Sequence, residues 1–478
     1  MSLAEVVLVL YLGVLGILSL NGMHRAWMVA VWLARRGAVL APPALDRVPR
    51  VTVQLPLYNE RYVVERVVFA CARLRWPADR MQIQILDDST DDTAALAATL
   101  AEQLRTEGLD VQHIRRADRV GFKAGALENG LRTATGELVA VFDADFVPPS
   151  DFLERCVPWF ADERVGMVQA RWGHLNEKDN WITRVQATLL DGHFVIEHAA
   201  RALSGKWFNF NGTAGIWRRE AITSAGGWEH DTLTEDLDLS YRAQLAGWRF
   251  VYLPEVVAPA ELPPSLAAFK TQQHRWAKGS IQTARKLLGR IWRAPIPWSI
   301  KLEATAHLCA NFSYPLVVAL TLLLPLAVAA RLERGASLAT LLRVDLVLFV
   351  VAVLPFVLFY AAGIVGSGSG GVSRRVVRLP IVLAVGLGMA VAQTRAMGEA
   401  LFGDVGTFVR TPKHGGVRRV AYLSHSRGIA SVELLLASYL GLACGYVITE
   451  GYVASLPFLA LFCAGYSSVG LGSLRAET

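Results

Sequence analysis

Long apolar runs lie at the start of the chain and again in its last third, with a more polar stretch between them. Residues 3–20 form one such run, LAEVVLVLYLGVLGILSL, in which Glu5 is the one charged residue. A bilayer core is about 30 Å thick, so about 20 apolar residues in a helix cross it. On this basis five helices are predicted to cross a membrane, at residues 3–20, 307–330, 345–365, 429–448 and 451–472.

The charged residues around the first run predict its orientation. No basic segment precedes residues 3–20, so we interpret the run as an anchor and not as a cleaved signal peptide. Arg25, Arg35, Arg36 and Arg47 follow it. Because basic residues accumulate on the cytoplasmic side of membrane helices, we expect the N-terminus outside and the following domain in the cytoplasm.

Residues 379–402 also form an apolar run, but two features set it apart. A crossing helix here would place the basic loop 403–428 outside, against the charge rule. The second half of the run carries Gln393, Arg395 and Glu399, a composition typical of a helix that lies along the membrane surface. We therefore predict an interfacial or re-entrant helix at 379–402.

Between the apolar ends, β-rich runs alternate with helical stretches. The β-rich runs are VTVQLPLYN (51–59), MQIQILDDS (81–89) and ELVAVFDADF (137–146), and the helical stretches are 61–74, 91–104 and 150–160. This alternation predicts βαβ units and a mainly parallel sheet. In such sheets ligands bind beyond the carboxyl ends of the strands.

Carboxylates cluster where two of the predicted strands end. Asp87 and Asp88 end one strand, and Asp143 and Asp145 end another. Neither a GxGxxG loop nor a GxxxxGK[ST] loop accompanies them, so a bound nucleotide would be held by carboxylates and a metal ion. For Asp87 and Asp88, a solvated strand end or a helix cap is an equally open interpretation.

Asp143 and Asp145 are the stronger candidates for metal ligands. Alternate residues of a strand face the same way, so the two carboxylates would repel each other unless a cation lay between them. Mg²⁺ and Mn²⁺ prefer oxygen ligands and bind one or two carboxylates together with substrate phosphates. Such an ion would neutralise the charge that builds up on a diphosphate leaving group.

The segment HDTLTEDLDLSYRAQLAGW (230–248) concentrates acidic residues at the start of a predicted helix. Thr234 fits the N-cap position, and Glu235, Asp236 and Asp238 complement the positive N-terminus of the helix. The alternative is that one of these acids is a general base that deprotonates an acceptor hydroxyl. The pattern alone leaves both interpretations open.

Composition narrows the class of protein. Hydrophobic residues make up 53% of the chain and charged residues 19%, which indicates that part of it lies in lipid. The net charge is +7, but no basic run or aromatic-rich basic patch occurs, so no nucleic-acid partner is expected. The five cysteines are scattered without a CxxC pair, which indicates reduced thiols and argues against a zinc site.

Four motifs follow one another along the chain: Asp87-Asp88, Asp143-Ala144-Asp145, Thr234-Glu235-Asp236 and Gln272-Gln273-His274-Arg275-Trp276. Together they resemble the signature of processive family-2 glycosyltransferases with a GT-A fold, such as cellulose, chitin and hyaluronan synthases, whose last motif is Q-x-x-R-W. Residues 171–186, 210–222 and 393–415 are similar to the cellulose synthase-like A group and its bacterial relatives, which make β-mannan and glucomannan. The resemblance covers essentially the whole chain.

The resemblance implies a role for each motif residue. Asp236 matches the catalytic base, and Asp143 and Asp145 match the metal-binding pair, with Asp145 the more direct ligand. For Lys123, an ordinary lysine at a helix start is the alternative to a donor contact. The residues expected to bind the donor are Tyr58, Glu60, Asp87, Asp88, Lys123, Asp143, Asp145, Gln272 and Arg275, and those expected at the acceptor are Asn211, Gly212, Thr213, Glu235 and Trp276.

Phe408, Thr411 and Lys413 resemble the mobile gating loop of the family, F-x-V-T-x-K. Here Arg410 stands where valine is usual and Pro412 follows the threonine. A basic loop next to the membrane is therefore the alternative interpretation.

The predicted fold is an α/β GT-A (Rossmann-like) cytoplasmic domain fused to an α-helical transmembrane domain, in a multi-pass protein of the bacterial inner membrane. The predicted limits are 1–48 for the anchor, 49–265 for the GT-A domain, 266–304 for interface helices and 305–478 for the transmembrane domain, which includes the helix 379–402 and the gating-like loop 403–415.

The implied reaction is a processive, inverting transfer of hexose with Mg²⁺ or Mn²⁺ as cofactor. GDP-mannose or UDP-glucose would be the donor, and the product a β-linked polysaccharide, with β-1,4 linkage expected, that crosses the membrane. The implied partners are this donor, a growing glycan or lipid acceptor, and membrane lipids. One alternative is a non-processive lipid glycosyltransferase, similar to glucosylceramide or glycosyldiacylglycerol synthases. Another is a membrane protein whose GT-A domain only senses a nucleotide sugar.

Overall fold

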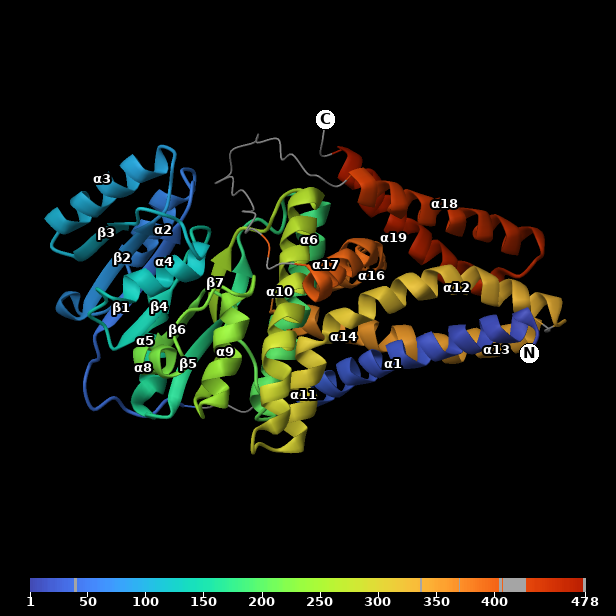
Figure 1. The fold of residues 1–478 in the computed structure, drawn as a ribbon, viewed down its shortest axis with the longest axis horizontal. Helices are drawn as coiled ribbons and strands as arrows, with labels where there is room; N and C mark the ends of the chain where they lie inside the picture. The colour runs from blue at the N-terminus through green and yellow to red at the C-terminus, as the bar shows by residue number, and fades with distance from the viewer. Residues whose placement is uncertain (38–40, 336–337, 369, 404–405, 407–426, 476–478) are drawn as a thin grey trace.

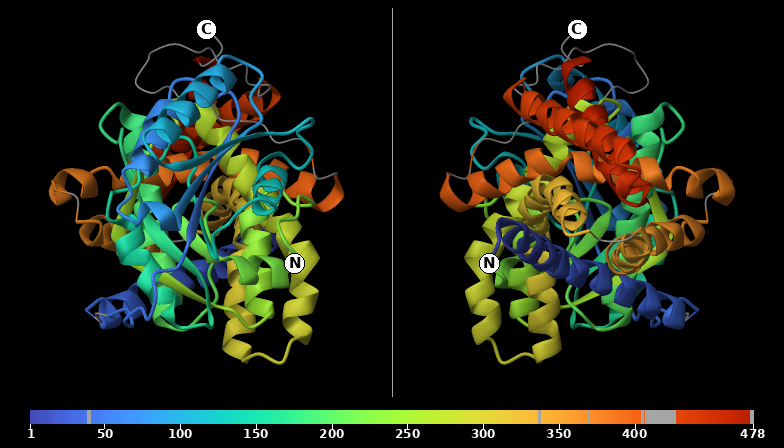
Figure 2. Two further views of the ribbon diagram at one scale, coloured as in Figure 1. Left: turned by 90° about the vertical axis from the view of Figure 1, so that its left-hand side faces the viewer. Right: turned by 90° about the vertical axis from the view of Figure 1, so that its right-hand side faces the viewer.

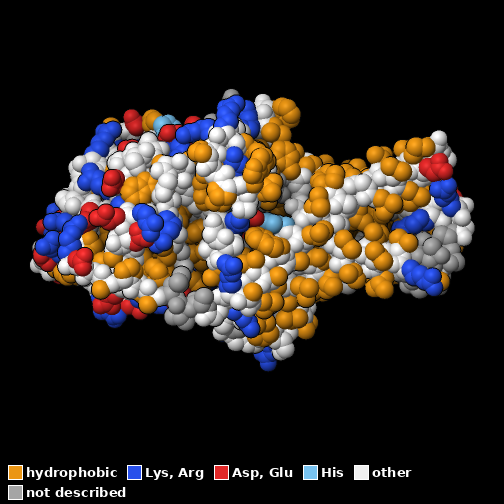
Figure 3. Space-filling model, turned by 90° about the horizontal axis from the view of Figure 1, so that it is seen from below, with side chains coloured by type: hydrophobic (Ala, Val, Ile, Leu, Met, Phe, Trp, Pro, Cys, Tyr) orange, Lys and Arg blue, Asp and Glu red, His pale blue; other side chains and the backbone are white. Residues whose placement is uncertain are grey.

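The protein is elongated, with a sheet domain at one end and a bundle of long helices at the other (Figure 1). A computed structural model describes residues 1–37, 41–335, 338–368, 370–403, 406 and 427–475. Charged side chains gather on the sheet domain, whereas hydrophobic side chains cover the helical end in the face that Figure 3 shows. This division matches the polar and apolar stretches of the sequence.

One seven-stranded sheet forms the centre of the first domain, in the order β3-β2-β1-β4-β6-β5-β7. Only β6 runs antiparallel to its neighbours, so the predicted mainly parallel sheet is confirmed. The strands are β1 (Val51–Leu57), β2 (Met81–Asp87), β3 (Asp110–Arg115), β4 (Leu138–Val141), β5 (Val165–His174), β6 (Gly215–Arg218) and β7 (Arg249–Ala260).

Helices cover both faces of the sheet, and each face has its own hydrophobic core. In β4, Leu138 and Ala140 point into one core while Val139 and Val141 point into the other. The helices of this domain are α2 (Val64–Ala72), α3 (Thr93–Thr106), α4 (Phe122–Leu131), α5 (Phe152–Cys156), α6 (Trp181–Asp191), α7 (Ala199–Leu203), α8 (Arg219–Ser224) and α9 (Glu235–Leu245).

Polar residues inside the central strands pair with each other across the ladder. Thr52 donates to Gln82 Oε1 at 2.9 Å, and Gln54 Nε2 donates to Gln84 Oε1 at 3.0 Å. The strand register places each pair directly opposite. These side chains are fully buried, so the alternation in VTVQ and MQIQ marks an internal polar ladder and not a solvent-exposed face.

One predicted strand is shorter than its sequence suggests. The apolar run 137–146 was expected to be extended as far as the second aspartate, but β4 ends at Val141. Asp143 and Asp145 therefore lie in the turn after the strand, and strand alternation does not set their directions. The backbone N–H of Asp143 donates to Thr213 Oγ1 at 2.9 Å instead.

Among the described residues, six helices are long and apolar enough to cross a membrane. Each of the five predicted spans overlaps one of them. The set includes α1 (Leu3–Arg35), α12 (Ser313–Glu333), α14 (Leu354–Gly366, after α13, Leu338–Leu348), α18 (Arg427–Thr449) and α19 (Leu456–Arg475).

The sixth helical segment, Val372–Phe402, contains the run predicted to lie at the membrane surface. It divides into α15 (Val372–Val376), α16 (Leu379–Gly388) and α17 (Ala390–Phe402). Figure 1 shows α16 and α17 nearly end-on, whereas α1 and α12 run along the long axis. The length and composition of Val372–Phe402 would allow this segment to cross a membrane. Its interfacial position stays a prediction, and the predicted domain limits also stay predictions.

Helix α10 (Leu266–Arg293) stands between the sheet domain and the bundle (Figure 1), and α11 (Trp298–Leu308) follows it and runs back beside its end (Figure 2). Lys270 of α10 is buried and donates to both carboxylate oxygens of Glu433 in α18, at 2.8 and 2.9 Å, and to Ser473 Oγ in α19 at 3.0 Å. A buried ion pair thus joins this helix to the C-terminal helices.

Candidate active site

A cleft of about 180 Å³ opens at the carboxyl ends of the parallel strands, between the sheet and helices α9 and α10. Most of the predicted donor and acceptor residues line it. These are Tyr58, Glu60, Asp88, Lys123, Asp143, Asp145, Asn211, Gly212, Glu235, Asp236, Gln272, Arg275 and Trp276. The structure thus gathers in one place residues that are spread over more than 200 positions of the sequence.

The structure separates the two aspartates at the end of β2. Asp88 lines the cleft and accepts hydrogen bonds from Arg116 at 2.9 and 2.5 Å. Asp87 is 1% exposed and turns inward, where it accepts from the Ser89 N–H at 2.8 Å and lies 2.9 Å from His113 Nε2. Burial alone would raise the pKa of Asp87, but these hydrogen bonds lower it below its usual value. Asp87 therefore stabilises the end of β2, and Asp88 is the one of the two aspartates that is placed to contact a donor.

The carboxylate pair after β4 is asymmetric. Lys123 Nζ donates to Asp143 Oδ1 at 2.5 Å and to the Gly212 carbonyl at 2.8 Å, so Asp143 already has a cationic partner. Asp145 is 5% exposed and shares the cleft with Asp88. An all-oxygen donor set of this kind fits a Mg²⁺ or Mn²⁺ ion that is also bound by phosphates. Asp145 is the carboxylate best placed to hold it.

Among the described residues, the carboxylates whose spacing would suit a metal ion without any movement lie elsewhere, at Glu229, Asp231 and Asp238. Lys286 Nζ lies among them, at 2.5, 2.6 and 3.0 Å, so a lysine supplies the positive charge. Asp238 also binds Arg242 at 2.7 Å. This group does not line the cleft, which removes Asp238 from the candidate bases.

The part of the cleft at Tyr58 contains an aromatic ring and a cationic group. The Arg119 guanidinium lies 3.3 Å from the centre of the Tyr58 ring, and both residues line the cleft with Glu60. A stacked guanidinium and phenol offer a flat surface, which suits a nucleotide base.

Asp236 lies in the first turn of α9. Thr234 is the N-cap by position, but it makes no capping hydrogen bond, and its hydroxyl lies 3.4 Å from that of Thr283. Burial and the neighbouring Glu235 charge raise the pKa of Asp236 to about 7, against the opposing charge of Lys123. A carboxyl that titrates near neutral pH has the property expected of a general base.

This pKa predicts how the transfer rate depends on pH. Because Asp236 accepts a proton only as a carboxylate, the rate should rise with pH through about 7. Glu235→Gln removes the neighbouring negative charge, so the pKa of Asp236 should fall and the rising limb should move to lower pH. Rate profiles of both proteins from about pH 5 to 9 measure the shift. If the rising limb of the Glu235→Gln profile stayed in place or moved to higher pH, the charge of Glu235 would not be the cause of the raised pKa of Asp236.

The Q-x-x-R-W residues lie on one face of α10. Ser265 caps this helix by accepting from the Ala268 N–H at 3.2 Å. Residues three and four apart are neighbours on a helix, so Gln272, Arg275 and Trp276 all reach the cleft. The ring of Trp276 lies 6.3 Å from that of Trp172, and together they form an aromatic corner.

Two of the predicted acceptor residues shape the backbone around the site. Thr213 is fully buried and outside the cleft lining, where it holds the turn of Asp143. Gly212 has a φ of +81° and lies against the base: a Cβ there would be 3.1 Å from Asp236 Oδ2 and 3.4 Å from Lys123 Nζ. A glycine is required at this position both by conformation and by space.

We expect Gly212→Ala to lower the transfer rate by about tenfold or more, because the methyl group displaces Asp236 and Lys123. The left-handed conformation should also cost about 1–2 kcal/mol of unfolding free energy. Gly247→Ala is the matched control, since Gly247 has a φ of +96° with nothing within 4 Å. Transfer rate and Tm are measured for both variants. Equal loss of activity in the two would show that strain, and not contact with the base, is responsible.

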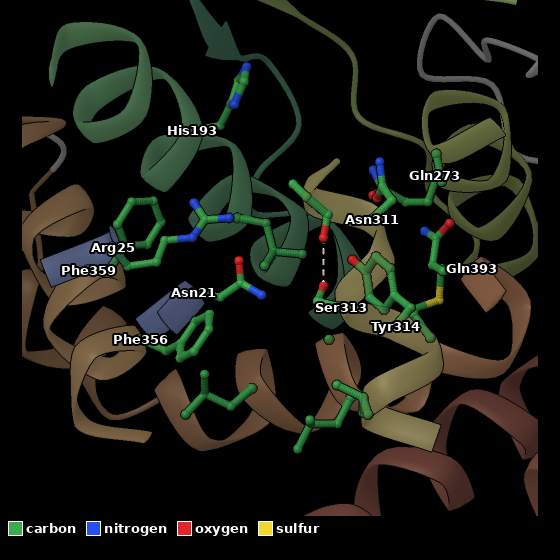
Figure 4. A pocket seen from close by; sticks show the side chains of 18 of the residues that line it. Asn21, Arg25, His193, Gln273, Asn311, Ser313, Tyr314, Phe356, Phe359 and Gln393 are labelled. Atoms are coloured by element: carbon green, nitrogen blue, oxygen red, sulfur yellow. Dashed lines mark hydrogen bonds between the residues drawn. The ribbon is translucent and has the colours of Figure 1, made fainter. Parts of the chain in front are cut away.

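Next to the cleft is a larger cavity of about 540 Å³ that reaches between the long helices (Figure 4). Asn21 and Arg25 enter it from α1, and Gln273, Asn311, Tyr314 and Gln393 face them from the other side. Seven residues line both the cleft and the cavity: Trp172, Leu190, Asn211, Thr234, Asp236, Gln272 and Trp276. The two spaces therefore meet at Asp236 and Trp276.

The sequence reasoning missed a buried polar group beside this junction. His193 and Glu197 line the cavity, and His174 lines the cleft. His193, Glu197 and Arg201 recur every four positions, and this spacing is the signal that could have revealed an inward polar face. Phe408, Thr411 and Lys413, predicted to form a gating loop, lie outside the described residues.

Comparison with known proteins agrees with this geometry. Residues 49–279 match the family described as Glycosyltransferase like family 2. Glucomannan 4-beta-mannosyltransferase 2 of Arabidopsis thaliana is 43% identical over 250 residues, which cover 51% of this chain and 47% of that protein. Glucomannan 4-beta-mannosyltransferase 1 of Oryza sativa subsp. japonica is 42% identical over 269 residues, which cover 55% of this chain and 51% of that protein. The predicted family resemblance is thus confirmed.

A solved structure is similar over most of this chain. The mannosyltransferase PcManGT from Pyrobaculum calidifontis, in complex with GDP-Man and Mn²⁺, is 25% identical, with a TM-score of 0.51. The match covers 75% of this chain and 98% of that one, which confirms the predicted GT-A fold. With the plant relatives the match is partial, and the chain spans about half their length.

Proposed function

Because residues 49–279 match the family described as Glycosyltransferase like family 2, we propose that this chain is a membrane-embedded, inverting and processive β-glycosyltransferase. It takes hexose from GDP-mannose, with UDP-glucose as the alternative donor, and adds it to a β-linked glycan, with β-1,4 linkage expected. The observation that carries the proposal is that Asp236 and Trp276 line both the cleft and the cavity. An acceptor sugar on Trp276 therefore meets the base while the rest of its chain extends into the cavity.

The donor site follows from the charges in the cleft. Asp145, with Asp143 beside it, would hold the divalent cation, which supplies positive charge to the diphosphate when bound. The Arg275 guanidinium forms paired hydrogen bonds with phosphate oxygens. Gln272 lies one helical turn before it on the same face, and Asp88, Tyr58 and Glu60 flank the nucleoside.

The transfer is one displacement. Asp236 takes the proton of the acceptor hydroxyl, whose oxygen attacks the anomeric carbon as the bond to the diphosphate oxygen breaks. The diphosphate leaves with that electron pair, and the configuration at the anomeric carbon inverts. The raised pKa of Asp236 makes it a stronger base than an ordinary carboxylate.

The six apolar helices support a multi-pass membrane enzyme, and the arginines that follow residues 3–20 support a cytoplasmic sheet domain. The cavity between α1, α12 and α14 supports passage of the glycan into the membrane part. The two relatives compared above are plant enzymes, which do not support the predicted bacterial inner membrane.

The proposal is tested with the purified full-length protein, each labelled nucleotide sugar, and Mg²⁺ or Mn²⁺. We expect polymeric product from GDP-mannose that a β-1,4-mannanase digests. A lipid-soluble monosaccharide product would overturn processive synthesis in favour of lipid glycosylation. Binding of nucleotide sugar without any turnover would overturn transfer itself and indicate a sensor.

A further inference from the structure

Asn211 lies between two imidazole rings at the junction of the cleft and the cavity. Its Oδ1 is 3.1 Å from His193 Nε2, and its Nδ2 is 2.9 Å from His198 Nε2. Its backbone N–H donates to Gln169 Oε1 at 3.0 Å. The next residue, Gly212, is packed against Asp236. The amide of Asn211 is therefore fixed beside the base, on the side where the acceptor lies.

A row of charged and polar groups leads away from this amide toward the first helix. His193 Nδ1 lies 2.8 Å from Glu197 Oε2, and Glu197 Oε1 forms an ion pair with Arg25 of α1. The Arg25 guanidinium also lies 4.5 Å from the centre of the Phe359 ring in α14. Figure 4 shows Arg25 reaching from α1 toward the part of the cavity where His193 lies.

The backbone that carries His193 is unusual. Residues Gly192–His198 form a π-helical turn between α6 and α7. Such turns are rare and are found frequently at functional sites. A Cβ at Gly192 would be 2.7 Å from the Phe359 ring, so the close approach of α14 requires glycine at this point. Helix α14 thus packs directly on the π-helical turn that carries His193.

The partners of the imidazole set the direction of the Asn211 amide. Nδ1 of His193 faces Glu197 Oε2 and Nε2 faces Asn211 Oδ1, so the ring bridges a carboxylate oxygen and an amide oxygen. Both oxygens are hydrogen-bond acceptors, and the ring donates to Asn211 Oδ1 when its hydrogen lies on Nε2. With its oxygen held on the ring, Asn211 turns its NH₂ group toward His198 and keeps a second N–H for a hydroxyl of the acceptor.

We propose that His193 is a positioning residue for the acceptor: with Glu197 it orients the Asn211 amide, which binds a hydroxyl of the neutral hexose lying on Trp276. The inference rests on the proposed function and adds to it a support that begins at Arg25 in the first membrane helix. Tyr58, Asp88 and Asp145, which are proposed to bind the nucleotide and the diphosphate, line the cleft, whereas His193 does not.

The test uses His193→Ala in the full-length protein with labelled GDP-mannose and Mn²⁺. We expect transfer to glycan to fall by about 10- to 100-fold, since small displacements of a bound group cost this much. The affinity for GDP-mannose should not change, and release of free sugar to water should continue. Added imidazole should restore part of the transfer activity by refilling the site. Glu197→Gln, which keeps the shape but loses the ionised acceptor, should show a smaller loss in the same direction.

The double variant His193→Ala/Asn211→Ala identifies the residue through which His193 acts. If His193 acts through Asn211, the double variant should transfer no more slowly than Asn211→Ala alone. Additive losses, a parallel loss of donor affinity, or wild-type transfer by His193→Ala would each overturn the inference while leaving the proposed function intact. A wild-type protein that makes no glycan from any donor would instead overturn the proposed function, and the inference with it.

Discussion

Asp236→Asn should reduce hexose transfer by about 10²- to 10⁴-fold, the range for loss of a positioned general base. The substitution keeps the size of the side chain and its place at the start of α9, but an amide does not take the acceptor proton. The raised pKa of Asp236, caused by burial and by Glu235, shows that the site already disfavours the negative charge, so a neutral amide should be tolerated by the fold. Initial rates at saturating donor measure the effect.

Donor binding is the control for this variant. Asp236→Asn should bind the nucleotide sugar about as well as the wild type, because the groups expected to hold the diphosphate, Asp145 and Arg275, are unchanged. Turnover close to the wild-type rate would show that another group is the base. Loss of all donor binding would show that Asp236 supports the fold and does not take part in proton transfer.

Asp145→Asn should remove most of the metal-dependent activity. A divalent ion at a leaving diphosphate supplies several kcal/mol of transition-state stabilisation, so we expect a fall of about 10²-fold or more at ordinary Mn²⁺ concentrations. In the wild type, a chelator should abolish transfer, and Mn²⁺ or Mg²⁺ should restore it. The concentration of Mn²⁺ at half-maximal rate is the quantity to compare, and it should rise in the variant.

Asp143→Asn is the matched variant for the metal site. Asp143 is already paired with Lys123 at 2.5 Å, so its loss should change the Mn²⁺ requirement less than the loss of Asp145. It should also release Lys123, which lowers the pKa of Asp236 through its charge. A larger metal effect at Asp143 than at Asp145 would reverse the assignment of the direct ligand.

The motifs predicted which residues meet, because each lies just beyond a strand end or on one helix face, and the topology of parallel sheets brings strand ends together. They did not predict which of two adjacent carboxylates faces the cleft. Asp87 turns inward because β3 brings His113 beside it, and that pairing joins residues from different strands. Periodicity along one segment carries no information about such a partner.

His193 and Glu197 were not predicted for the same reason, because their partners are distant in the sequence. The role inferred for His193 depends on its contact with Asn211, 18 positions later, and on Arg25 in a different helix, which pairs with Glu197. The strand before Asp143 was predicted too long because the apolar run continues to Phe142. The pairing of β4 with β6, however, ends at Val141. Hydrophobic pattern predicts where a residue is buried, and the hydrogen-bond partners decide where the strand ends.

The buried pair between Lys270 and Glu433 has a consequence for how the protein can be divided. Glu433 is fully buried in α18, and Lys270 lies in the helix that also carries Trp276. A shortened chain that kept α10 but lost the C-terminal helices would leave an ammonium group without its partner in apolar surroundings, which is strongly destabilising. The helix that carries Trp276 therefore depends on the last two helices for its stability, and a fragment that lacks them is not expected to retain the complete acceptor site.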